Sequence, residues 1–200
     1  MVRSYQNDLI RAGPGDDAMR GGAGDNRRKG GIDADTLDGG AGDDKVTGGG
    51  GDDLIWGGSG ADAFDGHAGS DTIWGGPGMD TIRGGPGDDT IWGDADNDTV
   101  TGGAGADMLH GGAGDDHLDG NTQNDTLWGG PGVDTLDGGG HDDELHGGPG
   151  EDTLRGGAGD DRLWGGIDAD TLDGGNGVDH ADGGPGADTC VRFDTTTGCE

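Results

Sequence analysis

A single apolar side chain recurs every nine residues along almost the whole chain. Counted from Ala12, the sequence divides into twenty units of nine residues without an insertion or deletion, and the last unit ends at Val191. Position 8 of the unit is aliphatic, Met or Phe in all but three units, which carry Arg28, Ala181 and Cys190 instead. A fixed period of this kind indicates a repeat architecture, in which each unit buries little alone and the core forms by stacking.

The polar positions of the unit predict one turn and one short strand. Glycine dominates positions 1, 2 and 4, which permits positive φ and close backbone approach, so positions 1 to 6 are expected to form a tight turn. Positions 7 to 9 then form a very short strand with position 8 pointing inward. Two units make an 18-residue coil with two turns and two strands, and stacked coils place position 8 of alternate units in two facing columns.

These two columns are the predicted core. One column consists of Met19, Leu37, Ile55, Ile73, Ile91, Leu109, Leu127, Leu145 and Leu163. The other consists of Val46, Phe64, Ile82, Val100, Leu118, Leu136, Leu154, Leu172 and Cys190.

Composition and charge exclude several classes of protein. With 54 glycines and 27% hydrophobic residues in 200, the chain has too little apolar side chain for the core of a conventional enzyme. The formal net charge of -31 repels phosphate backbones, so we expect no nucleic-acid partner. No stretch approaches the roughly 18 apolar residues of a membrane span, and residues 1–10 lack the layout of a signal peptide. We therefore expect either another export route or a piece of a longer secreted chain.

The acidic side chains concentrate in the predicted turns, and position 6 is Asp in every unit except the one with Asn26. Turns stacked about 4.8 Å apart would set these carboxylates in two anionic rows, which require cations between them. Carboxylate and carbonyl oxygens without His or Cys favour calcium over zinc or copper, and magnesium suits an all-protein cage less well. The predicted metal ligands are Asp17, Asp35, Asp44, Asp53, Asp62, Asp71, Asp80, Asp89, Asp98, Asp107, Asp116, Asp125, Asp134, Asp143, Asp152, Asp161, Asp170, Asp179 and Asp188.

The unit resembles the nonapeptide G-G-x-G-x-D-x-U-x of the RTX (repeats-in-toxin, hemolysin-type) calcium-binding family. Gly75 to Arg83 and Gly147 to Arg155 are typical copies. The resemblance covers residues 12–191 and implies an all-β fold, a right-handed parallel β-roll, with each ion held between successive turns by position-6 aspartates and turn carbonyls. Ten turns on each edge leave nine gaps per edge, hence about 18 calcium ions if every gap is filled as in the family.

Calcium is expected to act as a folding switch. The small aliphatic core cannot offset the entropy of ordering so glycine-rich a chain, so we predict a disordered calcium-free state that folds cooperatively as calcium is added. Extracellular repeats bind calcium at about 10⁻⁴ to 10⁻³ M, which predicts a folded chain outside the cell. The sequence thus predicts a secreted, calcium-binding structural or interaction scaffold.

Both ends depart from the repeat. Residues 1–11 are expected to form a degraded capping coil, residues 12–191 the roll and residues 192–200 a C-terminal cap. The roll is expected to be imperfect before Gly30, because the Arg27-Arg28-Lys29 run puts a charge in the inward column. Altered turns are expected where glycine is missing from position 2 or 4. Cys190 and Cys199 share the repeat phase, so we predict a disulfide, with two reduced core thiols as the alternative.

The outward faces suggest functions of different classes. Position 9 of alternate units carries Trp56, Trp74, Trp92, His110, Trp128, His146 and Trp164. These rings either pack on one another or form an adhesive platform for a glycan, a partner protein or a second copy of the roll. A Thr column on the opposite face lies beside charged residues that argue against ice binding. The alternative function is a protomer of an extracellular filament or matrix.

No catalytic role is expected for the chain. Its six histidines are scattered over different columns of the repeat, and no Ser-His-Asp or H-E-x-x-H pattern is present. In the family that the chain resembles, catalysis belongs to separate domains, none of which fits within these residues.

Overall fold

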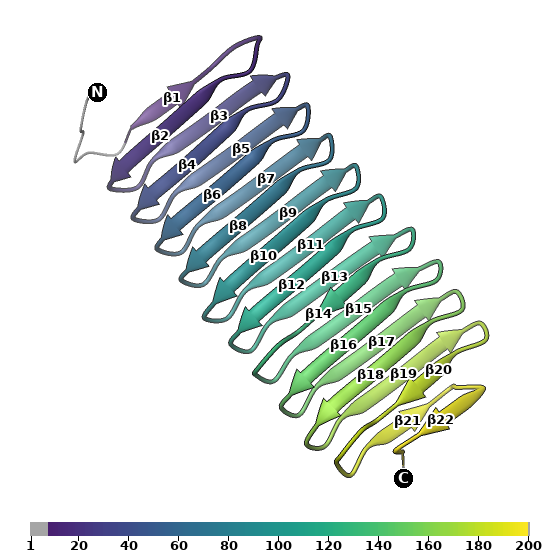
Figure 1. The fold of residues 1–200 in the computed structure, drawn as a ribbon. Coiled ribbons are helices and arrows are strands. Elements are labelled where there is room, and N and C mark those ends of the chain that lie inside the picture. The colour runs from purple at the N-terminus through teal and green to yellow at the C-terminus, as the bar shows by residue number, and fades with distance from the viewer. Residues whose placement is uncertain (1–7, 200) are drawn as a thin grey trace.

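Two parallel β-sheets face each other along the length of the molecule (Figure 1). The structure is a computed structural model that describes residues 8–199, and these residues form strands and turns. The odd-numbered sheet consists of β1 (Leu9–Arg11), β3 (Arg27–Ile32), β5 (Lys45–Gly50), β7 (Ala63–Ala68), β9 (Thr81–Pro86), β11 (Thr99–Ala104), β13 (His117–Thr122), β15 (Thr135–Gly140), β17 (Thr153–Ala158), β19 (Thr171–Asn176) and β21 (Thr189–Val191). The even-numbered sheet consists of β2 (Ala18–Ala23), β4 (Thr36–Ala41), β6 (Leu54–Ser59), β8 (Thr72–Pro77), β10 (Thr90–Ala95), β12 (Met108–Ala113), β14 (Thr126–Trp128), β16 (Glu144–Pro149), β18 (Arg162–Ile167), β20 (His180–Asp182) and β22 (Thr195–Thr197).

Strand pairing confirms the 18-residue coil. Ile73 pairs with Ile91, and Ile91 pairs with Leu109, so each residue lies beside its equivalent one coil further along. The chain alternates between the two sheets, and neighbouring strands within a sheet are parallel. The fold is therefore the predicted parallel β-roll. No helix long and apolar enough to cross a membrane occurs in residues 8–199.

The strands are longer than the sequence predicts. Most contain six residues and continue through positions 1 to 3 of the next unit, where three were expected. In β10 the pairing with β12 resumes after Gly93, with Asp94 opposite Gly112 and Ala95 opposite Ala113. The turn is thus confined to positions 4 to 6, because the glycines before it remain extended enough to hydrogen-bond across the sheet.

The glycine columns have two different causes. Glycines at positions 2 and 4, such as Gly76 and Gly78, have φ of 102° and 133°, a region that side chains disfavour. At position 1 the reason for glycine is lack of space for a side chain. A Cβ on Gly138 would lie 2.5 Å from Asp143 Oδ2 and 2.8 Å from the Gly156 carbonyl oxygen of the next coil. A side chain at position 1 would therefore displace the aspartate of its own turn.

Altered turns were expected where glycine is missing from position 2 or 4, but these turns keep the same left-handed backbone. All eight such residues keep a left-handed backbone with φ between 73° and 83°, among them His67 at position 2 and His141 at position 4. His141 still donates its backbone N–H to the Ala158 carbonyl at 2.6 Å. Most of the eight are Asp, Asn or His, the residue types that tolerate this region best.

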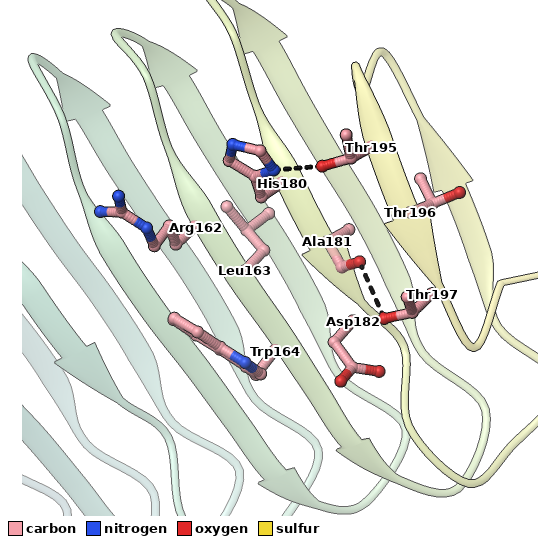
Figure 2. A pocket seen from close by; sticks show the side chains of 9 residues that line it. All are labelled: Arg162, Leu163, Trp164, His180, Ala181, Asp182, Thr195, Thr196 and Thr197. Atoms are coloured by element: carbon pink, nitrogen blue, oxygen red, sulfur yellow. Dashed lines mark hydrogen bonds between the residues drawn. The ribbon is translucent and has the colours of Figure 1, made fainter.

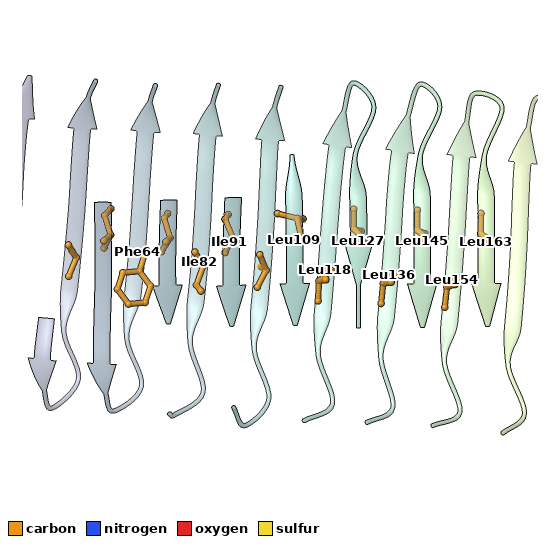
Figure 3. Close-up of a cluster of buried hydrophobic side chains, with 14 of the residues drawn as sticks. Phe64, Ile82, Ile91, Leu109, Leu118, Leu127, Leu136, Leu145, Leu154 and Leu163 are labelled. Carbon is orange, nitrogen blue, oxygen red and sulfur yellow. The ribbon is translucent and has the colours of Figure 1, made fainter. Parts of the chain in front are cut away.

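The core consists of the two predicted position-8 columns, which meet between the sheets (Figure 3). The position-8 leucines and isoleucines from Leu37 to Leu172 are almost fully buried, and Ala181 fills the last place of the column in the even-numbered sheet. Cys190, at the end of the other column, is only partly buried. Since each coil adds just two such side chains, the core consists of two columns of residues rather than a globular interior.

The ends are more regular than predicted. β1, β2 and β3 pair in register with the coils that follow, so the expected imperfection before Gly30 is wrong for the backbone. Residues 8–11 of the predicted capping coil join the first coil, while residues 1–7 lie outside the described residues. At the other end the predicted disulfide joins Cys190 to Cys199, with 5.8 Å between their Cα atoms.

A leucine in the two core columns should contribute far more to the free energy of unfolding than an apolar residue in a turn. Leu136→Ala removes a fully buried side chain, and we expect it to lower the free energy of unfolding by about 2–5 kcal/mol. Val133→Ala in the same unit is the control, because Val133 is 55% exposed. Urea unfolding of the calcium-saturated protein measures both. Equal losses would contradict the position of the core.

Candidate functional site: the two aspartate edges

Position-6 aspartates form a hydrogen-bonded ladder along each edge of the roll. Asp80 donates its backbone N–H to Asp98 Oδ1 at 2.8 Å, and its own Oδ1 accepts the N–H of Asp62 at 2.7 Å. Its carbonyl accepts the N–H of Thr99 at 2.9 Å. The same pattern repeats on the other edge, for example from Asp71 to Asp89 at 2.8 Å. Each carboxylate thereby links its turn to the turns of neighbouring coils.

One oxygen of most position-6 carboxylates is buried without a hydrogen-bond partner. Seventeen position-6 aspartates, from Asp35 to Asp188, have an Oδ2 atom that is inaccessible to solvent and accepts no hydrogen bond. A buried carboxylate oxygen without a donor is costly, and an ionised group in this position needs a counter-charge. The repetition of the same unsatisfied oxygen at seventeen aspartates fits a site for a cation at each of these turns.

The surroundings of this oxygen suit a hard cation. In the turn of Asp116, Oδ2 and the Gly129 carbonyl oxygen of the next coil lie 2.5 and 2.8 Å from the point that a Cβ on Gly111 would occupy. We call this space the glycine cradle. It is lined by a carboxylate oxygen and a carbonyl oxygen, and it stays open because Gly111 has no side chain. No three His, Cys, Asp or Glu side chains converge in residues 8–199, so backbone carbonyls must complete any metal site. Such all-oxygen ligation fits calcium.

Burial makes the ladder aspartates poor acids in the absence of a metal. Burial raises the pKa of Asp71 to about 7, although the hydrogen bond from the backbone of Asp53 opposes the shift. Burial likewise raises the pKa of Asp143 to about 8, and the neighbouring charge of Asp125 adds to the shift. Without a cation, a substantial fraction of these two carboxyl groups would be protonated near neutrality.

Acidic residues at position 5 form a second row outside the first, and their carboxylates accept hydrogen bonds from the following coil. The position-5 residues are exposed, and Asp43 Oδ1 accepts the backbone N–H of Ala61, one coil further on, at 3.0 Å. Asp160 Oδ1 accepts the N–H of Val178 in the same manner at 2.9 Å. Position-6 carboxylates accept from the preceding coil, so each turn is joined to both neighbours. The outer row also adds negative charge beside the glycine cradles.

The structure places eighteen of the nineteen predicted metal ligands in buried positions on these edges, and Asp17 at the first turn is partly buried. That they bind calcium stays a prediction. The ladder extends beyond the predicted residues at both ends. Asp8 donates its N–H to Asn26 Oδ1 at 3.0 Å, and Asp194 Oδ2 accepts the N–H of Asp179 at 3.1 Å. Asp8 shares the nine-residue phase, whereas Asp194 lies 15 residues after Asp179, so the repeat could not reveal it.

The outer face of the even-numbered sheet carries a continuous stack of rings. Trp56, Trp74, Trp92, His110, Trp128, His146 and Trp164 stack in this order. Neighbouring ring centroids are 4.3 to 5.9 Å apart and the planes differ by at most 6°. This confirms that the rings pack on one another. Each of the five inner rings has both faces covered, so the faces left for another molecule are those of the two end rings, Trp56 and Trp164.

A pocket lies at each end of this aromatic ladder, because the next strand carries Asp in place of a ring. Asp182 of β20 pairs with Trp164, and Asp38 of β4 pairs with Trp56. The pocket at Trp164 has a volume of about 290 Å³ and is also lined by Arg162 and by His180 (Figure 2). The pocket at Trp56 has a volume of about 300 Å³.

The raised pKa values predict that acid stabilises the calcium-free roll. A carboxyl group whose folded pKa lies above its ordinary value of about 3.9 contributes stability below that value and loses it as pH rises through the folded pKa. In EDTA, β-structure measured by circular dichroism should therefore decline as pH rises through about 6 to 8. Asp143→Asn should increase β-structure at pH 8, and Asp142→Asn, which removes an exposed charge, should do so much less. A signal that grows with pH would contradict this.

Comparison with known proteins agrees with the repeat and its edges. The family model of the RTX calcium-binding nonapeptide repeat, four copies long, matches residues 4–27, 29–64, 38–73, 56–91, 74–109, 110–145, 137–172 and 155–190. No curated protein matches the chain at a significant level. Because the matched segments cover nearly all of the repeat region, the chain belongs to the RTX calcium-binding nonapeptide repeat family.

Proposed function

We propose that this chain is a calcium-operated scaffold that is disordered without the ion and folds into the β-roll outside the cell. The observation that supports this most directly is the set of seventeen buried, unpartnered Oδ2 atoms. In water each of these carboxylates would be ionised and hydrated, and folding buries it with half of its acceptors unused. A divalent cation in the glycine cradles restores the lost interactions, which ties folding to calcium.

Cooperativity follows from the ladder. The Asp116 carboxylate accepts a hydrogen bond from Asp98 of the coil before it, while its cradle includes the Gly129 carbonyl of the coil after it, and most of the other buried ladder aspartates repeat this pattern. An ion bound there would contact groups of two coils at once. Coils of a repeat protein gain stability from their neighbours, so binding at one gap would favour binding at the next.

The setting we propose is extracellular. Sites of this kind bind calcium at about 10⁻⁴ to 10⁻³ M, a range reached outside cells. The Cys190–Cys199 disulfide closes the C-terminal end and suits an oxidising compartment. The repeat family and the solenoid are structural rather than catalytic, and the proposed role is to present the faces of the roll once calcium is bound.

Calcium titration of EDTA-treated protein tests the proposal. Far-UV circular dichroism should change from disorder to β-structure over a narrow calcium range while light scattering reports a constant mass. Asp116→Asn should shift the midpoint to higher calcium, and Asp115→Asn, in the exposed outer row, should shift it less. Absence of any transition would overturn the proposal. A transition with growing mass would favour the filament protomer over the monomeric scaffold.

A second candidate function is saccharide binding at the Trp164 end of the aromatic ladder. A sugar ring stacks on an indole face, and here Trp164 borders a pocket that Asp182 and Arg162 also line. Thr195 and Thr197 add hydroxyl groups from the next strand. The inner rings lack an open face, so a platform along the whole ladder is not the arrangement we propose.

Paired tryptophan variants test the sugar site. Trp164→Ala should abolish binding on a glycan array of calcium-loaded protein, and Asp182→Asn should weaken it about tenfold or more, as for loss of a hydrogen bond to a charged group. Trp92→Ala is the control, since Trp92 lies between Trp74 and His110 with both faces covered. Equal effects of Trp164→Ala and Trp92→Ala, or no glycan bound by the unaltered protein, would overturn this candidate.

A further inference from the structure

One nine-residue unit differs from all the others at both its edge position and its core position. The unit from Gly21 to Lys29 has Asn26 at position 6 and Arg28 at position 8, where every other unit has an Asp and a hydrophobic residue. Both side chains are buried, each about 2% exposed. A neutral ladder residue and a buried cation thus occur together, two residues apart, in a chain with only eleven Lys and Arg.

The guanidinium of Arg28 occupies the glycine cradle of its own turn. A Cβ on Gly21 would overlap Arg28 Nη2 and the Gly39 carbonyl oxygen, and would lie 2.5 Å from Arg28 Cζ. In the other turns the atom nearest this point is the Oδ2 of the position-6 aspartate or the carbonyl oxygen, as at Gly111 and Gly129. The side chain therefore turns from the core column toward the edge and fills the space that faces the next coil.

The guanidinium also reaches the acid across the gap. Arg28 Nη1 lies 4.0 Å from Asp44 Oδ2, the unpartnered oxygen of the next turn on the same edge, and both side chains are inaccessible to solvent. Asn26 preserves the ladder, because its N–H donates to Asp44 Oδ1 at 2.6 Å. The backbone pairing of this coil is likewise regular, with Arg28 beside Val46.

The charges of this gap sum to the same value as those of a calcium-filled gap. When only the two position-6 residues that border a gap are counted, two aspartates and one divalent ion are neutral together, and so are one asparagine, one aspartate and one guanidinium. Arg28 stays charged even though burial lowers its pKa, because a guanidinium ordinarily loses its proton only above pH 12. On the same count, an added calcium ion would give this gap a net charge of +2.

We propose that Arg28 is a tethered cation that takes the place of calcium in the gap between the turns of Asn26 and Asp44. The inference rests on the proposed function, since it assumes calcium in the neighbouring gaps. The first coils of that edge are then joined without an ion, and the protein binds one calcium fewer than its number of gaps. The residue pair Asn26 and Arg28 acts as one unit, because neither change alone leaves the gap neutral.

Native mass spectrometry tests this by counting ions on the whole, calcium-saturated protein. The variant Asn26→Asp/Arg28→Leu restores the common unit and should bind one calcium more than the unaltered protein. The control Asn26→Asp/Arg27→Leu has the same net charge but keeps Arg28, since Arg27 is exposed. It should bind no additional ion. Equal counts for the unaltered protein and both variants would overturn the proposal, as would an extra ion in both variants.

Single substitutions provide a second measurement in case the double variant folds poorly. Arg28→Leu leaves Asp44 beside Asn26 without a cation, so the calcium midpoint in circular dichroism should rise, and Arg28→Lys should restore it in part by returning a positive charge. A midpoint unchanged or lowered by Arg28→Leu would mean that Arg28 is merely an ill-fitting core residue. If the unaltered protein binds no calcium at all, the proposed function fails, and that outcome is distinct from an equal ion count among variants.

Discussion

The burial of a carboxylate with only one of its two oxygens hydrogen-bonded is the constraint on which this fold depends. The ladder oxygen Oδ1 fixes the distance between coils through the backbone N–H of the neighbouring turn, as between Asp98 and Asp80. The other oxygen has no donor and carries the charge that a cation must balance. In the function that we propose, folding and ion binding are therefore one process, because the site exists only where two coils are stacked and buried charge opposes stacking without the ion.

The glycine cradle shows why the repeat tolerates so little change at some positions and so much at others. A side chain at position 1 would enter the space between the aspartate and the next carbonyl, whereas positions 2 and 4 require only a left-handed backbone. His67 and Asp94 can therefore replace glycine at position 2 without loss of the coil. Arg28 fills the cradle of its turn, and it does so in the unit whose ladder residue is neutral.

The two faces of the roll differ because stacking in register places the equivalent residues of successive coils side by side. Repeating an aromatic residue at position 9 gives a ladder whose rings cover one another, which stabilises the sheet and hides the surfaces that a ligand would use. An open ring face then remains only where the repetition stops. At Trp164 the change from ring to carboxylate at Asp182 leaves one indole face beside a pocket with polar walls.

The sequence by itself determined the coil length, the two core columns and the position of the aspartates, because a unit with one turn and one inward residue can bury that residue when two units form each coil. It also indicated the Cys190–Cys199 pair from their common phase. Only the tertiary structure decided that the strands continue through positions 1 to 3, that Asp194 extends the ladder, and that the guanidinium of Arg28 lies in a cradle beside Asp44. These features depend on contacts between coils, 15 to 18 residues apart along the chain, which periodicity places side by side without specifying where each side chain points.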